Sequence, residues 1–173
     1  RVQISADSGS LTLGPDAVVD ARAQRGGVVH LTAGKDLTLR SGSQVLADSS
    51  ADAQVGANGG DILLGSTDGW VDLQSQAVVS AKGDDAEDGR IVIRAKVIAG
   101  NEMVDQGNDP NLEQGQTDAP PANAKGVKVK KIRASMAASE IQVEGVQTYH
   151  TSTGDNAHTQ TVVQTSRGPM TRT

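Results

Sequence analysis

Small apolar residues alternate with polar ones in short runs along this chain, and the runs recur. The segments VQISA (2–6), VVHLTA (28–33), DILLGS (61–66) and RIVIRA (90–95) can be superimposed. The superposition gives three columns: Val2, Val29, Ile62 and Ile91; Ile4, Leu31, Leu64 and Ile93; and the small residues Ala6, Ala33, Ser66 and Ala95. Because side chains alternate between the two faces of a strand, each column is expected to lie on one face of a sheet.

Two further runs follow in each repeat. The second is LTL (11–13), LTL (37–39) and VDL (71–73), and the third carries Val19, Val45 and Val79, each followed two residues later by Ala. Short strands joined by brief turns cannot all pair as hairpins and also keep these columns in register, whereas a chain that winds once per repeat can. The pattern therefore predicts an all-β fold, a right-handed parallel β-helix (solenoid), with the hand that parallel crossovers usually take.

A β-sandwich is the alternative fold, because it also consists of short alternating strands separated by frequent turns. It does not predict three columns that repeat together. Most of the variation in repeat length falls after the third run, in residues 22–26, 48–59 and 82–89. We expect the loops at these positions to project from one corner of the coil.

The pattern divides the chain into four parts. Residues 1–98 carry the regular β-helix coils, and residues 99–126 are so rich in Asn, Asp, Gln, Gly and Pro that they predict a long polar loop insertion at the same corner. Alternation returns in residues 127–149, which predicts further β-helix strands, although residues 136–140 could hold a helical turn instead. Residues 150–173 form a Thr-rich terminal segment that we expect to be partly ordered.

The composition narrows the kind of interior that the chain can form. Its 173 residues include no Phe, one Trp and one Tyr, so the core must consist of Val, Ile, Leu and Ala.

A net charge of −5 gives no general attraction to nucleic acid or to an anionic membrane. The absence of Cys fits export through an oxidising compartment. No apolar run could span a bilayer and no signal peptide is evident. Because the chain opens at Arg1 without Met, we expect a piece of a longer protein whose targeting information lies outside this sequence.

The stretch GGVVHLTAGKDLTLRSGSQVLA (26–47), with GGDILLGSTDGWVDLQSQAVVSAKG (59–83) after it, resembles the coils of the filamentous haemagglutinin family. The later GRIVIRA (89–95) and KIRASMAASEIQVEGVQTY (131–149) are similar to a block of large family members. In that block an IVLRA-like strand precedes a loop and a small-residue run that ends in a VEGVKVY-like strand. Family members are large bacterial surface or secreted exoproteins, commonly exported by a two-partner route.

This resemblance covers roughly residues 1–150, and it implies a right-handed β-helical shaft on the cell exterior. Such a shaft serves adhesion, or holds an adhesive or toxic end away from the surface. The implied location is secreted or on the exterior of the outer membrane. The implied partners are a host or neighbouring-cell surface, including its glycans, and an outer-membrane transporter for the parent protein. Neither the export domain of the family nor a toxin end has a counterpart here.

Few residues suggest catalysis. A β-helix enzyme that acts on polysaccharide places two or three carboxylates on one outward face, with a basic residue nearby. The predicted outward columns hold no stacked pair of acids: Gln3, His30, Leu63 and Val92; Ser5, Thr32, Gly65 and Arg94; and Thr12, Thr38 and Asp72. We therefore expect no catalytic residue and no cofactor. A module that binds or cleaves polysaccharide is the alternative function.

Two charged clusters and one aromatic ring are the candidate binding residues. One cluster is a basic strip that could meet an anionic glycan, although such strands more often simply face water: Lys125, Lys128, Lys130, Lys131 and Arg133. Trp70 precedes the second run, where we expect it at a corner or on the outer wall, and an exposed ring there can stack on sugar.

The other cluster is an acidic turn, a weak calcium candidate formed by Asp84, Asp85, Glu87 and Asp88. Its spacing matches neither the EF-hand loop nor the glycine-rich calcium repeat, so a solvated corner is the expected arrangement.

Overall fold

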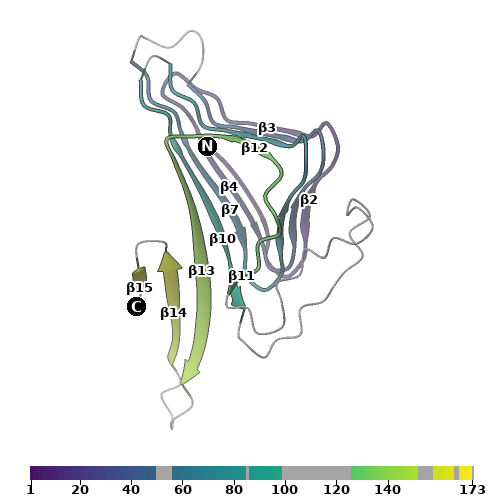
Figure 1. Cartoon of the computed structure of the whole chain (residues 1–173), viewed down its shortest axis with the longest axis vertical. Helices are drawn as coiled ribbons and strands as arrows, with labels where there is room; N and C mark the ends of the chain where they lie inside the picture. The colour runs from purple at the N-terminus through teal and green to yellow at the C-terminus, as the bar shows by residue number, and fades with distance from the viewer. Residues whose placement is uncertain (50–55, 85, 99–125, 152–157, 166–167, 173) are drawn as a thin grey trace.

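The computed structural model describes residues 1–49, 56–84, 86–98, 126–151, 158–165 and 168–172. Within these residues the chain forms β-strands and no helix. The strands belong to three sheets that the chain visits in turn, and Figure 1 shows the three sheets as the sides of a triangle.

The first sheet is the largest. Its parallel strands are β1 (Val2–Ala6), β4 (Val28–Ala33), β7 (Asp61–Ser66), β10 (Arg90–Ile98) and β13 (Glu140–Thr151). Two antiparallel strands continue it beyond β13, namely β14 (His158–Thr165) and β15 (Gly168–Arg172). The short strand β11 (Gly126–Val127) pairs in antiparallel fashion with the end of β10.

The other two sheets are built from short strands. The second sheet contains β2 (Leu11–Leu13), β5 (Leu37–Leu39) and β8 (Val71–Leu73). The third contains β3 (Val18–Asp20), β6 (Gln44–Leu46), β9 (Val78–Ser80) and β12 (Ser135–Ala137). All neighbours in both sheets are parallel, so each strand lies beside its counterpart from the next repeat.

The register confirms the columns that the sequence predicts. Ile4 pairs with Leu31, Leu31 with Leu64, and Leu64 with Ile93. The same holds for the second and third runs, where Leu13, Leu39 and Leu73, and Val19, Val45 and Val79, lie opposite one another. These parallel ladders do not fit a β-sandwich, because its neighbouring strands are antiparallel.

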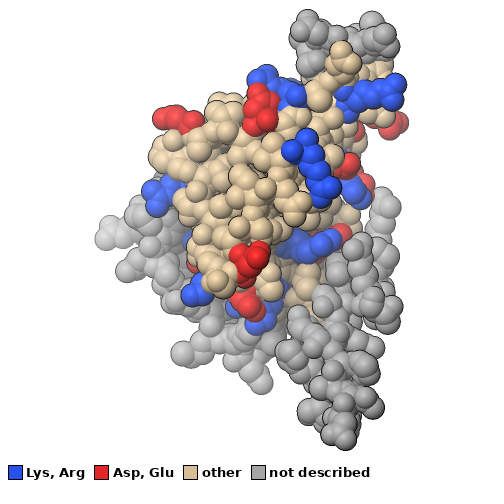
Figure 2. Space-filling view, turned by 180° about the vertical axis from the view of Figure 1, so that it is seen from behind, with Lys and Arg blue, Asp and Glu red and all other residues tan. Residues whose placement is uncertain are grey.

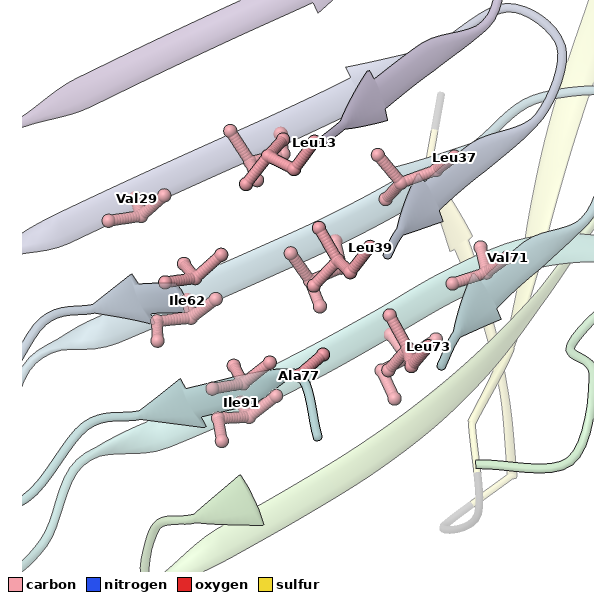
Figure 3. Packing of buried hydrophobic residues seen from close by; sticks show 14 of the residues in the cluster. Leu13, Val29, Leu37, Leu39, Ile62, Val71, Leu73, Ala77 and Ile91 are labelled. Atoms are coloured by element: carbon pink, nitrogen blue, oxygen red, sulfur yellow. The ribbon is translucent and has the colours of Figure 1, made fainter. Parts of the chain in front are cut away.

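The core lies between the three sheets and consists of stacked aliphatic side chains (Figure 3). Leu31, Leu64 and Ile93 are completely buried, as are Leu39 and Leu73 of the second sheet. Burial of each such side chain contributes about 1.5–3 kcal/mol, and here it is shared with the layers on both sides. This stacking explains how a chain almost without aromatic rings forms a core.

The position of the long polar insertion differs from the sequence prediction. Residues 99–125 lie outside the described residues, but their flanks Ile98 and Gly126 pair with each other at the end of β10. The insertion therefore begins and ends where the chain passes from the first sheet to the second. The variable segments 48–59 and 82–89 instead connect the third sheet to the first. The prediction that all three project from one corner is wrong, because composition marks a loop without placing it.

The C-terminal part contains more strand than the alternation indicates. Residues 135–137 form β12, which pairs with β9, so the possible helical turn at 136–140 is absent. β13 continues past residue 149 to Thr151. Beyond it, β14 lies beside the far half of β13, and β15 lies beside β14 (Figure 1).

Glycine lies at the passages from β3 to β4, from β6 to β7 and from β9 to β10, whereas Ser139 takes this position before β13. The amides of Gly27 and Gly60 both donate to the carbonyl of Ala47, at 3.1 and 3.0 Å, and the amide of Gly89 donates to Ala81 at 2.6 Å. A Cβ on Gly60 would overlap the carbonyl oxygen of Gly27, and one on Gly89 would overlap that of Gly60. We call this stack of Gly27, Gly60 and Gly89 the glycine corner. Successive layers touch there through backbone alone.

Replacing Gly60 by Ala should therefore destabilise the fold by roughly 1–3 kcal/mol or more, because the new methyl group has backbone rather than a movable side chain against it. Gly9→Ala is the matched control, since nothing lies within 4 Å of a Cβ at Gly9, and it should change stability by less than about 0.5 kcal/mol. Urea unfolding followed by circular dichroism measures both. Equal midpoints for the two variants would show that the glycine corner is not a close contact.

Candidate functional site

The segment after the long insertion adds one more layer beside the second sheet. Val71 donates its amide to the carbonyl of Lys128 at 2.9 Å, and Lys130 returns an amide to the carbonyl of Val71 at 2.9 Å. Farther along, the amide of Arg133 donates to Leu73 at 3.0 Å. The basic strip of the sequence is thus a backbone neighbour of β8.

Trp70 lies at the corner between β7 and β8, as the sequence predicts. Its amide donates to Asp36 Oδ1 at 2.7 Å, and its carbonyl accepts from the amide of Leu37 at 2.9 Å. Lys128 lies next to Trp70 in the following layer, because its carbonyl accepts the hydrogen bond from the amide of Val71. Trp70 as a whole is half-buried. The fold therefore brings Trp70, Lys128 and Lys130 together, and we call these three residues the Trp70 corner.

The lysines of the Trp70 corner are held by acceptors from the preceding layer. Lys130 Nζ lies 3.5 Å from Asp72 Oδ2, and Lys128 Nζ donates to the carbonyl of Asp68 at 3.2 Å. Lys96 Nζ lies 3.4 Å from Asp68 Oδ1. Asp72 is only 9% exposed and also accepts from Gln74. The corner is therefore a surface of alternating charge, and not the bare basic strip that the sequence suggests.

The remaining members of the basic strip are not part of the Trp70 corner. Lys131 is exposed, and Arg133 is half-buried with a partner of its own. Lys125 lies outside the described residues. At the Trp70 corner itself, Lys96, Lys128 and Lys130 lie close to the acidic residues Asp36, Asp68 and Asp72, so positive and negative side chains are intermixed there.

Residues of the acidic turn form hydrogen bonds with neighbouring residues at their own corner. Asp88 Oδ1 accepts from the amide of Gly83 at 2.9 Å, and the carbonyl of Asp88 accepts from Ser139 Oγ at 2.6 Å. The amide of Asp84 donates to Ala57 at 2.9 Å, Glu87 is exposed, and Asp85 lies outside the described residues. In the part of the chain that the structure describes, no three His, Cys, Asp or Glu side chains are grouped so that they could hold a metal ion.

An ion pair on the outer face of the first sheet was missed from the sequence. The register of β10 and β13 places Arg94 opposite Glu144, and Arg94 Nε and Nη2 donate to Glu144 Oε2 at 2.7 and 2.6 Å. Glu144 is only 8% exposed. Extending the outward column of Ser5, Thr32, Gly65 and Arg94 by one more layer would have found this pair.

Asp72 and Glu144 are the buried carboxylates of the described residues, and they lie on different sheets. Each faces a cation, Lys130 for Asp72 and Arg94 for Glu144. A glycosidase needs two carboxyl groups on either side of one bond. This arrangement suits structural ion pairs better than acid–base chemistry.

Comparison of the chain with models of protein families, with curated proteins and with solved structures finds no match. No helix of the described residues has the length and apolar character needed to cross a bilayer.

At the end of β3, Arg22 holds the carboxylate of Asp20 by its Nε and Nη2, at 3.0 and 2.6 Å from Oδ1 and Oδ2. These side-chain hydrogen bonds, with a further one from the Arg22 amide, lower the pKa of Asp20 from 3.8 to about 2. A lowered pKa means that the pair stabilises the fold above pH 3.8 and that this contribution is lost as the pH falls from 3.8 to about 2. Both side chains are about half exposed, so the effect on stability is small.

Carboxyl NMR titration should accordingly place the Asp20 midpoint near pH 2. Arg22→Gln should return it toward 3.8, whereas Arg25→Gln, at an exposed position of the same loop, should leave it unchanged. An ordinary midpoint in the unmodified chain would contradict this ion pair.

Proposed function

We propose that this chain is a segment of the shaft of a large, secreted or surface-exposed bacterial adhesin similar to filamentous haemagglutinin. Its three sheets are then the walls of a right-handed parallel β-helix, and its parent protein attaches the bacterium to host cells, neighbouring cells or other surfaces. An outer-membrane transporter would export the parent. No cofactor takes part.

The observation that carries this proposal is the repetition of the same inward columns in successive layers. Leu31, Leu64 and Ile93 lie directly opposite one another and are completely buried, although each belongs to a different repeat. Such a structure grows in length by adding layers, because each layer contacts only its neighbours. A protein that must hold an adhesive surface away from a membrane needs this kind of growth.

The outward positions support the same function. They carry mainly polar and charged groups, such as His30, Thr38 and Arg94. On the face of the molecule that Figure 2 shows, Lys, Arg, Asp and Glu are scattered with uncharged areas between them. The variable segments at the glycine corner change length between repeats while the columns stay in register. Recognition residues can therefore vary at the corners without disturbing the core.

The adhesive part of the proposal is tested on beads. Beads coated with the folded chain should attach to cultured cells under flow at least several-fold more often than beads coated with the chain kept denatured, because a folded outer surface is required. Circular dichroism of the released protein checks the fold on each batch. Attachment no greater than that of the denatured chain would mean that this segment is only a spacer.

The Trp70 corner favours one second function, namely binding of an acidic polysaccharide. It combines an aromatic face with Lys128 and Lys130 on adjacent layers. A ring covers a sugar while the ammonium groups meet its carboxylates. The acceptors Asp72 and Asp68 would then have to share these lysines with the ligand.

Fluorescence tests this second function directly, because Trp70 is the single tryptophan of the chain. A uronic-acid polymer should change its emission in a saturable way that weakens with salt. Lys128→Gln with Lys130→Gln should weaken binding about tenfold, whereas Lys82→Gln, at another exposed position, should not. No change in emission at low salt would exclude the site, and an unchanged polymer length after incubation would exclude cleavage.

A further inference from the structure

Three pairs of residues in the chain have the composition at which a protein backbone rearranges without an enzyme: Asn58–Gly59, Asp68–Gly69 and Asp88–Gly89. In such a pair the glycine nitrogen attacks the side-chain carbonyl carbon of the residue before it, because glycine has no Cβ to hinder the approach. Two local conditions control this reaction. The N–H of the glycine must not be held in a hydrogen bond, and the side chain before it must be able to turn toward that nitrogen.

Two of the three pairs do not meet these conditions. The amide of Gly59 donates to the carbonyl of Glu87 at 3.0 Å, and the amide of Gly89 donates to the carbonyl of Ala81 at 2.6 Å. Asp88 Oδ1 also accepts from a backbone amide of its own loop at 2.9 Å. Attack at either pair would first have to break hydrogen bonds that hold the loops after β6 and β9.

The Asp68–Gly69 pair lies between β7 and β8 and differs on both points. The amides on either side of Gly69 bind the preceding layer, that of Asp68 at 3.0 Å and that of Trp70 at 2.7 Å. The amide of Gly69 itself donates to none of the described residues. The side chain of Asp68 is 70% exposed, with Oδ1 at 3.4 Å from Lys96 Nζ, so most of this carboxyl group borders water and can turn.

We propose that Asp68–Gly69 is a site of spontaneous backbone modification, at which aspartate converts to isoaspartate through a cyclic imide. The nitrogen of Gly69 forms a bond to Cγ of Asp68, and its proton leaves with a carboxyl oxygen as water. Water then adds to the main-chain carbonyl carbon of Asp68, and the bond from this carbon to the nitrogen of Gly69 breaks. The main chain now runs through Cγ, and the total composition of the chain is unchanged.

Lys128 favours isoaspartate as the product. The imide can open at either of its two carbonyl carbons, and opening at Cγ simply restores aspartate. Lys128 Nζ donates to the main-chain carbonyl oxygen of Asp68 at 3.2 Å. A cation at this oxygen withdraws electrons from the carbon to which water must add, so it directs the opening toward isoaspartate.

Isoaspartate at this position changes the Trp70 corner. It lengthens the main chain by one carbon between the amides of Asp68 and Trp70, both of which bind the preceding layer. Gly69 packs closely against that layer, since a Cβ on it would lie 2.5 Å from the carbonyl carbon of Lys35. The longer chain therefore has to bulge outward and displace Trp70. This inference concerns the corner whatever binds there, and it does not rest on the proposed function.

Digestion with the protease Asp-N measures the conversion, because this enzyme cleaves before aspartate and not before isoaspartate. The folded chain is kept in warm neutral buffer for several weeks, unfolded, digested and analysed by mass spectrometry against the fresh chain. The fraction left uncut should be at least several-fold larger at Asp68 than at Asp88. The matched control is the chain kept in guanidinium chloride for the same time, where neither pair keeps its hydrogen bonds and the two fractions should be similar.

Complete cleavage at Asp68 of the stored folded chain would overturn the proposal, as would equal uncut fractions at Asp68 and Asp88. Lys128→Gln tests the direction of ring opening and should lower the uncut fraction at Asp68. Lys131→Gln, at an exposed position of the same segment, should leave that fraction unchanged. Circular dichroism confirms that both variants are folded, and equal fractions for the two would overturn the role of Lys128.

Discussion

Backbone contact at the glycine corner is the constraint on which the layered structure depends. At Gly27, Gly60 and Gly89 successive layers touch without any side chain between them, and the adjacent carbonyl of Ala47 accepts from two of these glycines. The chain returns to this spacing before β4, β7 and β10, whatever the length of the preceding loop. Because that point is fixed, the three strands that follow begin in register and their inward residues stack on like residues.

The stacking of like residues explains why the core needs almost no aromatic rings. Each layer supplies a few aliphatic side chains, and these complete their burial against the layers above and below. A round core would need large rings to fill its centre, but a thin core between three sheets does not. The small residues in turn allow the sheets to approach, as Ala47 and Ala81, both completely buried, do beside the glycine corner.

The columns could be predicted from the sequence because alternation in a strand is a local property, and Ile4, Leu31 and Leu64 each display it independently. The corner that holds the long insertion could not be predicted, because a polar segment has the same composition at whichever corner it lies. The Arg94–Glu144 pair could be predicted only by extending the outward column across that insertion to β13, whose register places Glu144 opposite Arg94. For the candidate site, Trp70 and the lysines were evident, but their proximity and their acidic partners depended on which strand lies beside β8.

The change from parallel to antiparallel pairing along β13 bears on how the chain folds. Parallel partners such as Ile4 and Leu31 are a whole layer apart in sequence, so their pairing must overcome the loop-closure entropy of that segment. The antiparallel pairs of β13, β14 and β15 are joined by short connections and need no such closure. Local contacts form faster than distant ones, so we expect the antiparallel pairs of β13, β14 and β15 to form before the parallel layers close.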